Sequence, residues 1–101
     1  MPLGFDACVI CNVLYFNMLY KLEPTAQDQD SLQYLTTMLE HGDHIAKPAQ
    51  VAPYYPHSSI ILYHLAKLIQ AFDPAPLRFF KQQIQAEIGD LLAAPLKLTE
   101  R

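Results

Sequence analysis

Charged residues and cysteine are scarce in this sequence, and each shortage excludes a class of protein. Only 17% of the residues are charged, against about 25% in typical soluble domains. The seven basic residues form no cluster and are outnumbered by ten acidic ones, which argues against a nucleic-acid-binding surface. Two cysteines are too few for the disulfide framework of a small secreted domain or for a four-cysteine zinc site.

Long apolar runs and targeting signals are also missing. The longest apolar run, residues 7–20, contains Asn12 and Asn17 and is too short to span a bilayer. Residues 1–6 carry no basic side chain ahead of this run, whereas a secretory signal peptide begins with a positively charged segment. The sequence therefore predicts a cytoplasmic protein without a membrane span.

Hydrophobic residues, in contrast, make up 51% of the chain. This content rules out intrinsic disorder, and a length of 101 residues predicts one domain. A chain of this mass buries about 65% of its unfolded surface on folding, so a monomer with one core is feasible. The apolar excess indicates a surface that contacts something outside the chain.

Eight prolines divide the sequence into four segments with helical periodicity. No segment alternates convincingly as a strand would, so we predict an all-α domain over residues 1–101. It consists of four helices in two antiparallel hairpins, about 6–43 and about 57–94, joined by a proline-rich connector, 44–56.

Local signals set the expected helix ends. Asp6 is the expected N-cap of the first helix, which runs to about residue 22, and Thr25 opens a capping-box pattern before the second. Gly42 supplies the stop of the second helix. The third begins near residue 58, and Asp73-Pro74 is expected to open the fourth as an N-cap followed by proline at the first helical position.

The first and third predicted helices are apolar around most of their circumference, whereas the second and fourth are amphipathic. Helices of the first kind are buried on several sides, so we expect them to be the inner helices. A faint repeat accompanies this alternation, because Leu14-Tyr15 recurs as Leu62-Tyr63 one hairpin later. Two repeat units and an ordinary four-helix bundle both explain the pattern.

Two groups of residues on and near the predicted inner helices form a further pattern. They are Asp6, Val9, Asn12, Val13 and Leu14 in the first group, and Tyr54-Tyr55-Pro56, Tyr63 and Lys67 in the second. They resemble the inner-helix pattern of α/α-toroid proteins, the repeats shared by squalene-cyclase-like terpenoid cyclases and prenyltransferase-type chains. The resemblance covers about residues 6–90 and implies a toroid-like fragment of two hairpins.

The resemblance does not extend to a catalytic site. The Asp-x-Asp-Asp acid motif of the cyclases is missing, and the nearest stretch, Asp28-Gln-Asp30-Ser31, starts an outer helix. Because the chain has no tryptophan, the family's glutamine–tryptophan turn motif is impossible. The Asp, Cys and His that hold zinc in protein prenyltransferases have no identifiable counterparts. The resemblance therefore implies a fold and an apolar cavity, and we predict no catalytic residue.

Two clusters raise the question of metal or redox chemistry. Cys8 and Cys11 have the spacing of a thioredoxin motif but lie on an apolar helix, so we expect buried packing residues. His41, Asp43 and His44 lie together at the end of the second helix and are candidates for binding a divalent metal ion. Histidines at a helix C-terminus also interact with the free carbonyl groups there. On balance we expect no metal ion and no cofactor.

The candidate ligand-binding residues are polar and aromatic side chains of the apolar helices and the connector. We expect Asn12 to be buried, and a buried amide needs partners because leaving it unpaired costs about 1–3 kcal/mol. It either ties the first helix to a neighbour or faces a ligand cavity. Tyr15, Phe16, Tyr55 and Tyr63 either line a pocket for an apolar or cationic ligand or belong to the core.

These observations favour a non-catalytic helical-repeat or interaction module of unknown biochemical role. Such a module presents apolar inner-helix surface to copies of itself as a homo-oligomer, to a partner protein, or to an apolar small molecule. The alternative is a fragment of a terpenoid cyclase- or prenyltransferase-like enzyme whose catalytic residues lie outside this chain. A small metal or redox protein is a third class, which rests on the histidine cluster and the cysteine pair.

Overall fold

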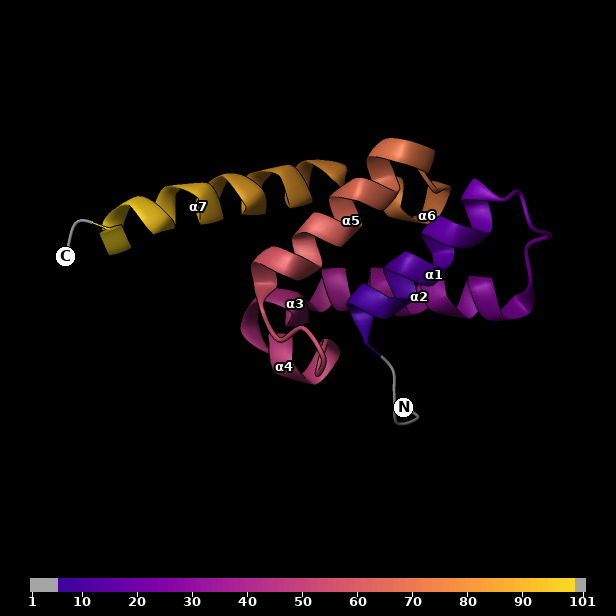
Figure 1. Ribbon diagram of the computed structural model, residues 1–101, viewed down its shortest axis with the longest axis horizontal. Helices are drawn as coiled ribbons and strands as arrows, with labels where there is room; N and C mark the ends of the chain where they lie inside the picture. Colours follow the sequence, from indigo (N-terminus) through magenta and orange to yellow (C-terminus); the bar gives the residue numbers. More distant parts are fainter. Residues whose placement is uncertain (1–5, 100–101) are drawn as a thin grey trace.

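The computed structural model describes the backbone of residues 6–99 and the side chains of residues 6–93. All regular structure in that range is helical, which confirms the all-α fold class. The helices are α1 (Ala7–Leu19), α2 (Ala26–His41), α3 (Asp43–Ala46), α4 (Pro48–Val51), α5 (Ser58–Phe72), α6 (Ala75–Arg78) and α7 (Lys81–Thr99) (Figure 1). Residues 1–5, on which the argument against a signal peptide rests, lie outside the described range.

Four of the expected helix ends are confirmed, and one of them is the start of α5 at Ser58. Asp6 is the N-cap of α1, and its Oδ1 accepts hydrogen bonds from the backbone N–H groups of Cys8 at 2.8 Å and Val9 at 3.1 Å. The capping box that Thr25 opens before α2 is complete. Gly42 ends α2 with a φ of 71°, a left-handed conformation that glycine adopts without steric cost.

The expected start of the last helix is wrong. Asp73 is the C-cap of α5, with a φ of 45°, and its side chain pairs with Arg78 at 3.1 Å. A separate short helix, α6, follows Pro74, and α7 begins only at Lys81. An Asp-Pro pair suits either role, because it can end one helix as readily as it opens the next.

The predicted number of helices is also wrong. The proline-rich connector contains α3 and α4, and Pro48 occupies the first position of α4, where its missing N–H is not needed. With α6, these short helices bring the total within residues 6–99 to seven. α7 also continues through Pro95 instead of ending near residue 94.

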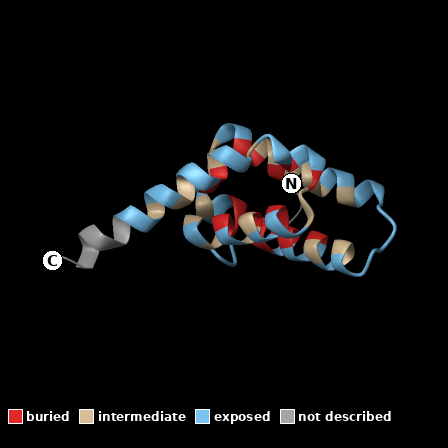
Figure 2. Cartoon of the chain, turned by 90° about the horizontal axis from the view of Figure 1, so that it is seen from above, coloured by how far each residue is buried: buried red, intermediate tan, exposed pale blue. Residues whose placement is uncertain are grey.

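The core forms around α5, which packs against α1 on one side and against α7 on another. Its buried residues are Ile61, Leu62, Leu65, Leu68 and Ile69. They belong to the same hydrophobic core as buried residues of α1 and α2, among them Leu14, Leu35 and Leu39. Figure 2 shows the buried residues gathered on the facing sides of the helices, while the far part of α7 extends away from this body.

The expectation that the first helix is buried on several sides is wrong. Only one side of α1 is buried, through Ala7, Cys8, Ile10, Cys11 and Leu14. The opposite side carries Val9, Asn12, Val13, Phe16, Leu19 and Tyr20, all of which are exposed. Because both sides of α1 are apolar, hydropathy alone does not identify the buried side, and the other helices cover just one of them.

A buried carboxylate joins the start of α1 to the segment that follows α4. Asp6 is fully buried, and its Oδ2 accepts a hydrogen bond from the backbone N–H of Tyr54 at 2.8 Å. The two carboxylate oxygens of Asp6 therefore accept hydrogen bonds from three backbone N–H groups, two in the first turn of α1 and one at Tyr54. Burial of a charged group is costly unless such partners are present, so Asp6 is both a cap and a tertiary link.

Substitution of Asp6 tests this double role. Asp6→Ala should lower the free energy of unfolding by about 3 kcal/mol, because it removes an N-cap and leaves the Tyr54 N–H without an acceptor. Thr25→Ala, which removes only an exposed local cap, should cost about 1 kcal/mol. Urea denaturation measures both. Equal losses in the two variants would contradict the tertiary contribution of Asp6.

Candidate functional site

The exposed side of α1 is a continuous apolar surface, which we call the α1 face and define as Val9, Asn12, Val13, Phe16, Leu19 and Tyr20. Its five apolar members are between 37% and 62% exposed. Phe16 and Tyr20 contact each other with ring centroids 4.7 Å apart. The face carries no charged side chain, and Asn12 lies near its middle. Unpartnered apolar surface of this kind marks contact sites more often than chance exposure.

The structure divides the five predicted ligand-binding residues among three places. Asn12 and Phe16 lie on the α1 face, so the expectation that Asn12 is buried is wrong. Tyr55 is exposed in the segment between α4 and α5. Only Tyr15 and Tyr63 come together, as part of the lining of one hollow between α1 and α5.

Lys67 gives that hollow its charge. Its Nζ lies 4.6 Å from the centroid of the Tyr15 ring, a cation–π contact that holds the ammonium group over the aromatic face. The Tyr15 ring also packs edge-on against Phe72, with centroids 5.1 Å apart. The hollow has a volume of about 380 Å³ and includes Ala66 and Gln70 in its lining.

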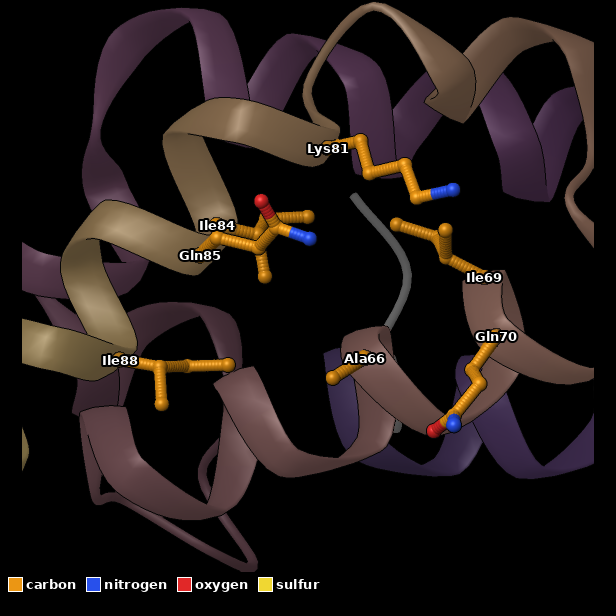
Figure 3. Close-up of a pocket in the computed structure, with 7 residues that line it drawn as sticks. All are labelled: Ala66, Ile69, Gln70, Lys81, Ile84, Gln85 and Ile88. Atoms are coloured by element: carbon orange, nitrogen blue, oxygen red, sulfur yellow. The ribbon is translucent and has the colours of Figure 1, made fainter.

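Two further hollows lie along the line where α5 meets α7, and we call them together the α5–α7 groove. The first, of about 420 Å³, is lined by Ala66, Ile69, Gln70, Lys81, Ile84, Gln85 and Ile88 (Figure 3). The second, of about 320 Å³, is lined by Ser59, Leu62, Tyr63, Ala66, Ile88, Leu91 and Leu92. They share Ala66 and Ile88 and are therefore adjacent.

The two ends of the α5–α7 groove differ in chemistry. At one end the lining includes Lys81, Gln70 and Gln85, and Figure 3 shows the Lys81 side chain extending from the start of α7 towards Ile69. At the other end the lining is apolar apart from Ser59 and the Tyr63 hydroxyl. The groove is therefore cationic and polar at one end and apolar at the other.

A partly buried polar pair outside the groove holds α7 to the rest of the fold. His44 is fully buried, and its Nε2 lies 2.7 Å from Oε1 of Glu87. Because an ionised carboxylate only accepts hydrogen bonds, this Nε2 carries the proton and donates. Gln83 adds a hydrogen bond from its Nε2 to the Leu39 carbonyl oxygen at 3.1 Å. These contacts fix the first turns of α7 to the end of α2 and to α3.

The histidine cluster and the cysteine pair adopt arrangements that sequence alone left open. His44 is engaged with Glu87, whereas His41 is exposed. Across the described residues, no three His, Cys, Asp or Glu side chains come close enough to hold a metal ion. Cys8 and Cys11 are free and buried. Burial, with a smaller effect of Asp6, raises the pKa of Cys8 to about 11, and burial raises the pKa of Cys11 still further.

The residues that shape the groove carry little signal in the sequence. A single alanine on an apolar helix has no distinctive chemistry, yet Ala66 borders all three hollows. Lys81 belongs to the polar stripe of an amphipathic helix, which by itself indicates only solvent exposure. The nearness of Lys81 to α5 depends on the antiparallel packing of α5 and α7, which brings residue 81 near residue 70, and no local pattern encodes it.

Comparison with known proteins leaves the geometry as the sole guide to function. No protein-family model, no curated protein and no solved structure matches this chain. Regarding membranes, none of the helices described here combines the length and the hydropathy that crossing a bilayer requires.

The raised pKa values of the cysteines predict chemical protection. The thiolate is the form that reacts, so at about pH 8 iodoacetamide should alkylate Cys8 and Cys11 at least about a hundredfold more slowly in the folded protein than in urea. Mass spectrometry over time measures both rates. Rapid alkylation of the folded protein would contradict the burial of this pair.

His64 on α5 predicts a pH effect on stability. Burial lowers its pKa, with a smaller contribution from Lys67. The unfolded chain therefore takes up a proton near pH 6.5, before the folded chain does, and stability falls as pH drops through that value. When the pH drops from about 7.5 to about 5.5, the free energy of unfolding should fall less in the His64→Gln variant than in the wild type. Identical pH slopes in urea titrations would contradict a lowered pKa.

Proposed function

We propose that this chain is a non-catalytic interaction module that pairs with a second copy of itself through the α1 face. The single observation that carries the proposal is the composition of that face. Five apolar side chains and one amide lie exposed on one helix without a charged residue among them. Charges are depleted at the centres of protein interfaces, whereas an ordinary solvent-facing helix surface carries charged and polar residues.

The available area suits a small homodimer. Tyr54 and Tyr55 are 66% and 44% exposed, and the hydrogen bond from Tyr54 to Asp6 places them next to the start of α1. The exposed surface of the α1 face and these two rings together amounts to roughly 700 Å². A standard interface buries about 800 Å² on each partner, so the α1 face and the two tyrosines supply most of what is needed.

The position of Asn12 favours an antiparallel pairing about a two-fold axis. In such an arrangement, a residue on the axis meets its own copy, and two amides placed there can each donate to the carbonyl oxygen of the other. Val9 of one copy then lies near Phe16 of the other. Tyr20 reaches the region of Tyr54 in the second copy. Polar residues at one interface position set the register in helical pairs at some cost in stability.

The same pairing bears on the toroid-like interpretation. α1 and α5, the two predicted inner helices, pack directly on each other, which agrees both with two repeat hairpins, α1–α2 and α5–α7, and with an ordinary bundle. A closed toroid would cover the outer side of α1 with another hairpin, and in our proposal the second copy takes that place. The alternative of a cyclase- or prenyltransferase-like fragment stays a prediction that no contact among residues 6–93 favours.

Charge placed on the α1 face should separate the copies. Phe16→Glu should weaken dimerisation at least about a hundredfold, because a carboxylate would be buried without a partner. Sedimentation velocity over a micromolar concentration series measures the dissociation constant. Gln82→Glu, an equal charge change at an exposed residue of α7, is the matched control and should leave the dimer intact. A wild-type protein that stays monomeric throughout the series would overturn the proposal.

Cross-linking tests the register. Asn12→Cys should give a disulfide-linked dimer under mild oxidation, since residue 12 meets its own copy in the proposed pair. Tyr63→Cys, at an exposed site on α5, should remain unlinked, and the native cysteines are buried. Non-reducing gel electrophoresis reads the result. Cross-linking at residue 63 but not at residue 12 would contradict the α1 pairing.

A further inference from the structure

We propose that the α5–α7 groove binds one single-chain anionic amphiphile of the fatty-acid class. Its carboxylate would lie at the end lined by Lys81, next to the hollow that holds Lys67, and its acyl tail would run along α5 towards Leu92. The site is separate from the α1 face, so this inference goes beyond the proposed self-association and does not depend on it.

The charges around the groove favour an anion. Lys81 lines the groove itself, and Lys67 lines the adjacent hollow towards α1, which shares Ala66 and Gln70 with the groove. Among residues 6–93, no Asp or Glu lines any of the three hollows that meet at Ala66. Within the described part of the chain, neither lysine forms an ion pair. A carboxylate at this end of the groove would be attracted by Lys81 and, from the adjacent hollow, by Lys67.

The carboxylates of α7 do not compensate for this charge. Glu87 and Asp90, the acids of α7 within residues 6–93, line none of the three hollows, and Glu87 is hydrogen-bonded to His44. The positive end of the groove thus persists in a chain whose net charge is −3. A local field opposite in sign to the net charge points to a specific anionic ligand and not to general attraction of anions.

The length of the groove suits an acyl tail of about a dozen carbons. From Gln70 to Ser59 the lining covers eleven residue steps of α5, or about 16 Å at 1.5 Å per residue. The lining becomes apolar along this path, through Leu62, Leu91 and Leu92. Each buried methylene of an acyl chain contributes roughly 0.8 kcal/mol to binding, which makes the tail the source of affinity and the lysines the source of selectivity.

The volume of the groove suits a single acyl tail. The two adjacent hollows measure about 420 and 320 Å³, which lies within the range of small-molecule pockets.

Calorimetric titration with three twelve-carbon probes tests the proposal. Dodecanoate, below its critical micelle concentration, should bind one-to-one with a micromolar dissociation constant. Dodecanol should bind at least about tenfold more weakly, and dodecyltrimethylammonium should not bind. Acetate, which has the headgroup alone, should also fail to bind. Equal affinity for the anionic and cationic probes would overturn the proposal, because it would indicate nonspecific adsorption to apolar surface.

Variants of the groove residues test where the ligand binds and distinguish contacts of its headgroup from contacts of its acyl tail. The double variant Lys67→Gln with Lys81→Gln should weaken dodecanoate binding about tenfold without changing dodecanol binding, while Lys47→Gln, at an exposed lysine outside the groove, should change neither. Ala66→Phe should abolish binding of both probes, because it fills the point where the hollows meet. Circular dichroism checks that each variant is folded. Undiminished binding in folded Ala66→Phe would overturn the assignment to this groove.

Two further measurements separate the groove from the α1 face and a free amphiphile from a membrane surface. Dodecanoate should bind the Phe16→Glu variant as tightly as wild type, and weaker binding there would show that the ligand depends on the α1 face, which contradicts the proposal. Vesicles of anionic phospholipid should not retain the protein at physiological ionic strength. Retention that is lost in the double lysine variant would identify a membrane surface as the partner and would overturn the proposal.

Discussion

The buried carboxylate of Asp6 is the constraint on which the arrangement of the helices depends. Its two oxygens accept three backbone N–H groups, two from the first turn of α1 and one from Tyr54. A charged group in the core tolerates little displacement, because each lost hydrogen bond leaves part of the charge unsolvated. The start of α1 is therefore fixed beside the chain that enters α5, and the contact between these two helices, which forms most of the core, follows from that.

The two apolar sides of α1 explain how a short chain can have both a core and an uncovered face. Leu14 and its neighbours bury one side, and α5 is the helix that α1 contacts most closely. α7 cannot cover the α1 face, because Gln83 and Glu87 bind it to the end of α2 and to α3. The excess of apolar residues is thus concentrated where no helix of the described chain can reach.

Local features of the fold could be predicted from sequence, whereas the features that depend on several helices could not. The caps at Asp6 and Gly42 arise from the residue itself and its immediate neighbours, so the pattern identifies them. The role of Asp73 depends on Arg78 and on the turn into α6, which the Asp-Pro pair does not reveal. The exposure of Asn12 depends on which side of α1 meets α5. The groove at Ala66 requires the packing of α5 against α7, which no single segment specifies.

The attachment of α7 has a mechanical consequence. Gln83 and Glu87, which anchor the helix, are about 6 Å apart along its axis, whereas the helix continues for about 18 Å beyond Glu87 to Thr99. A helix held this way acts as a rigid lever with a short arm at the anchor. If α7 rotates about the His44–Glu87 contact, Thr99 at its far end moves about three times as far as Gln83 at the other end of the anchor. Because Ile88 and Ala66 lie close to the pivot, the distance between them changes little, whereas the end of the helix moves furthest.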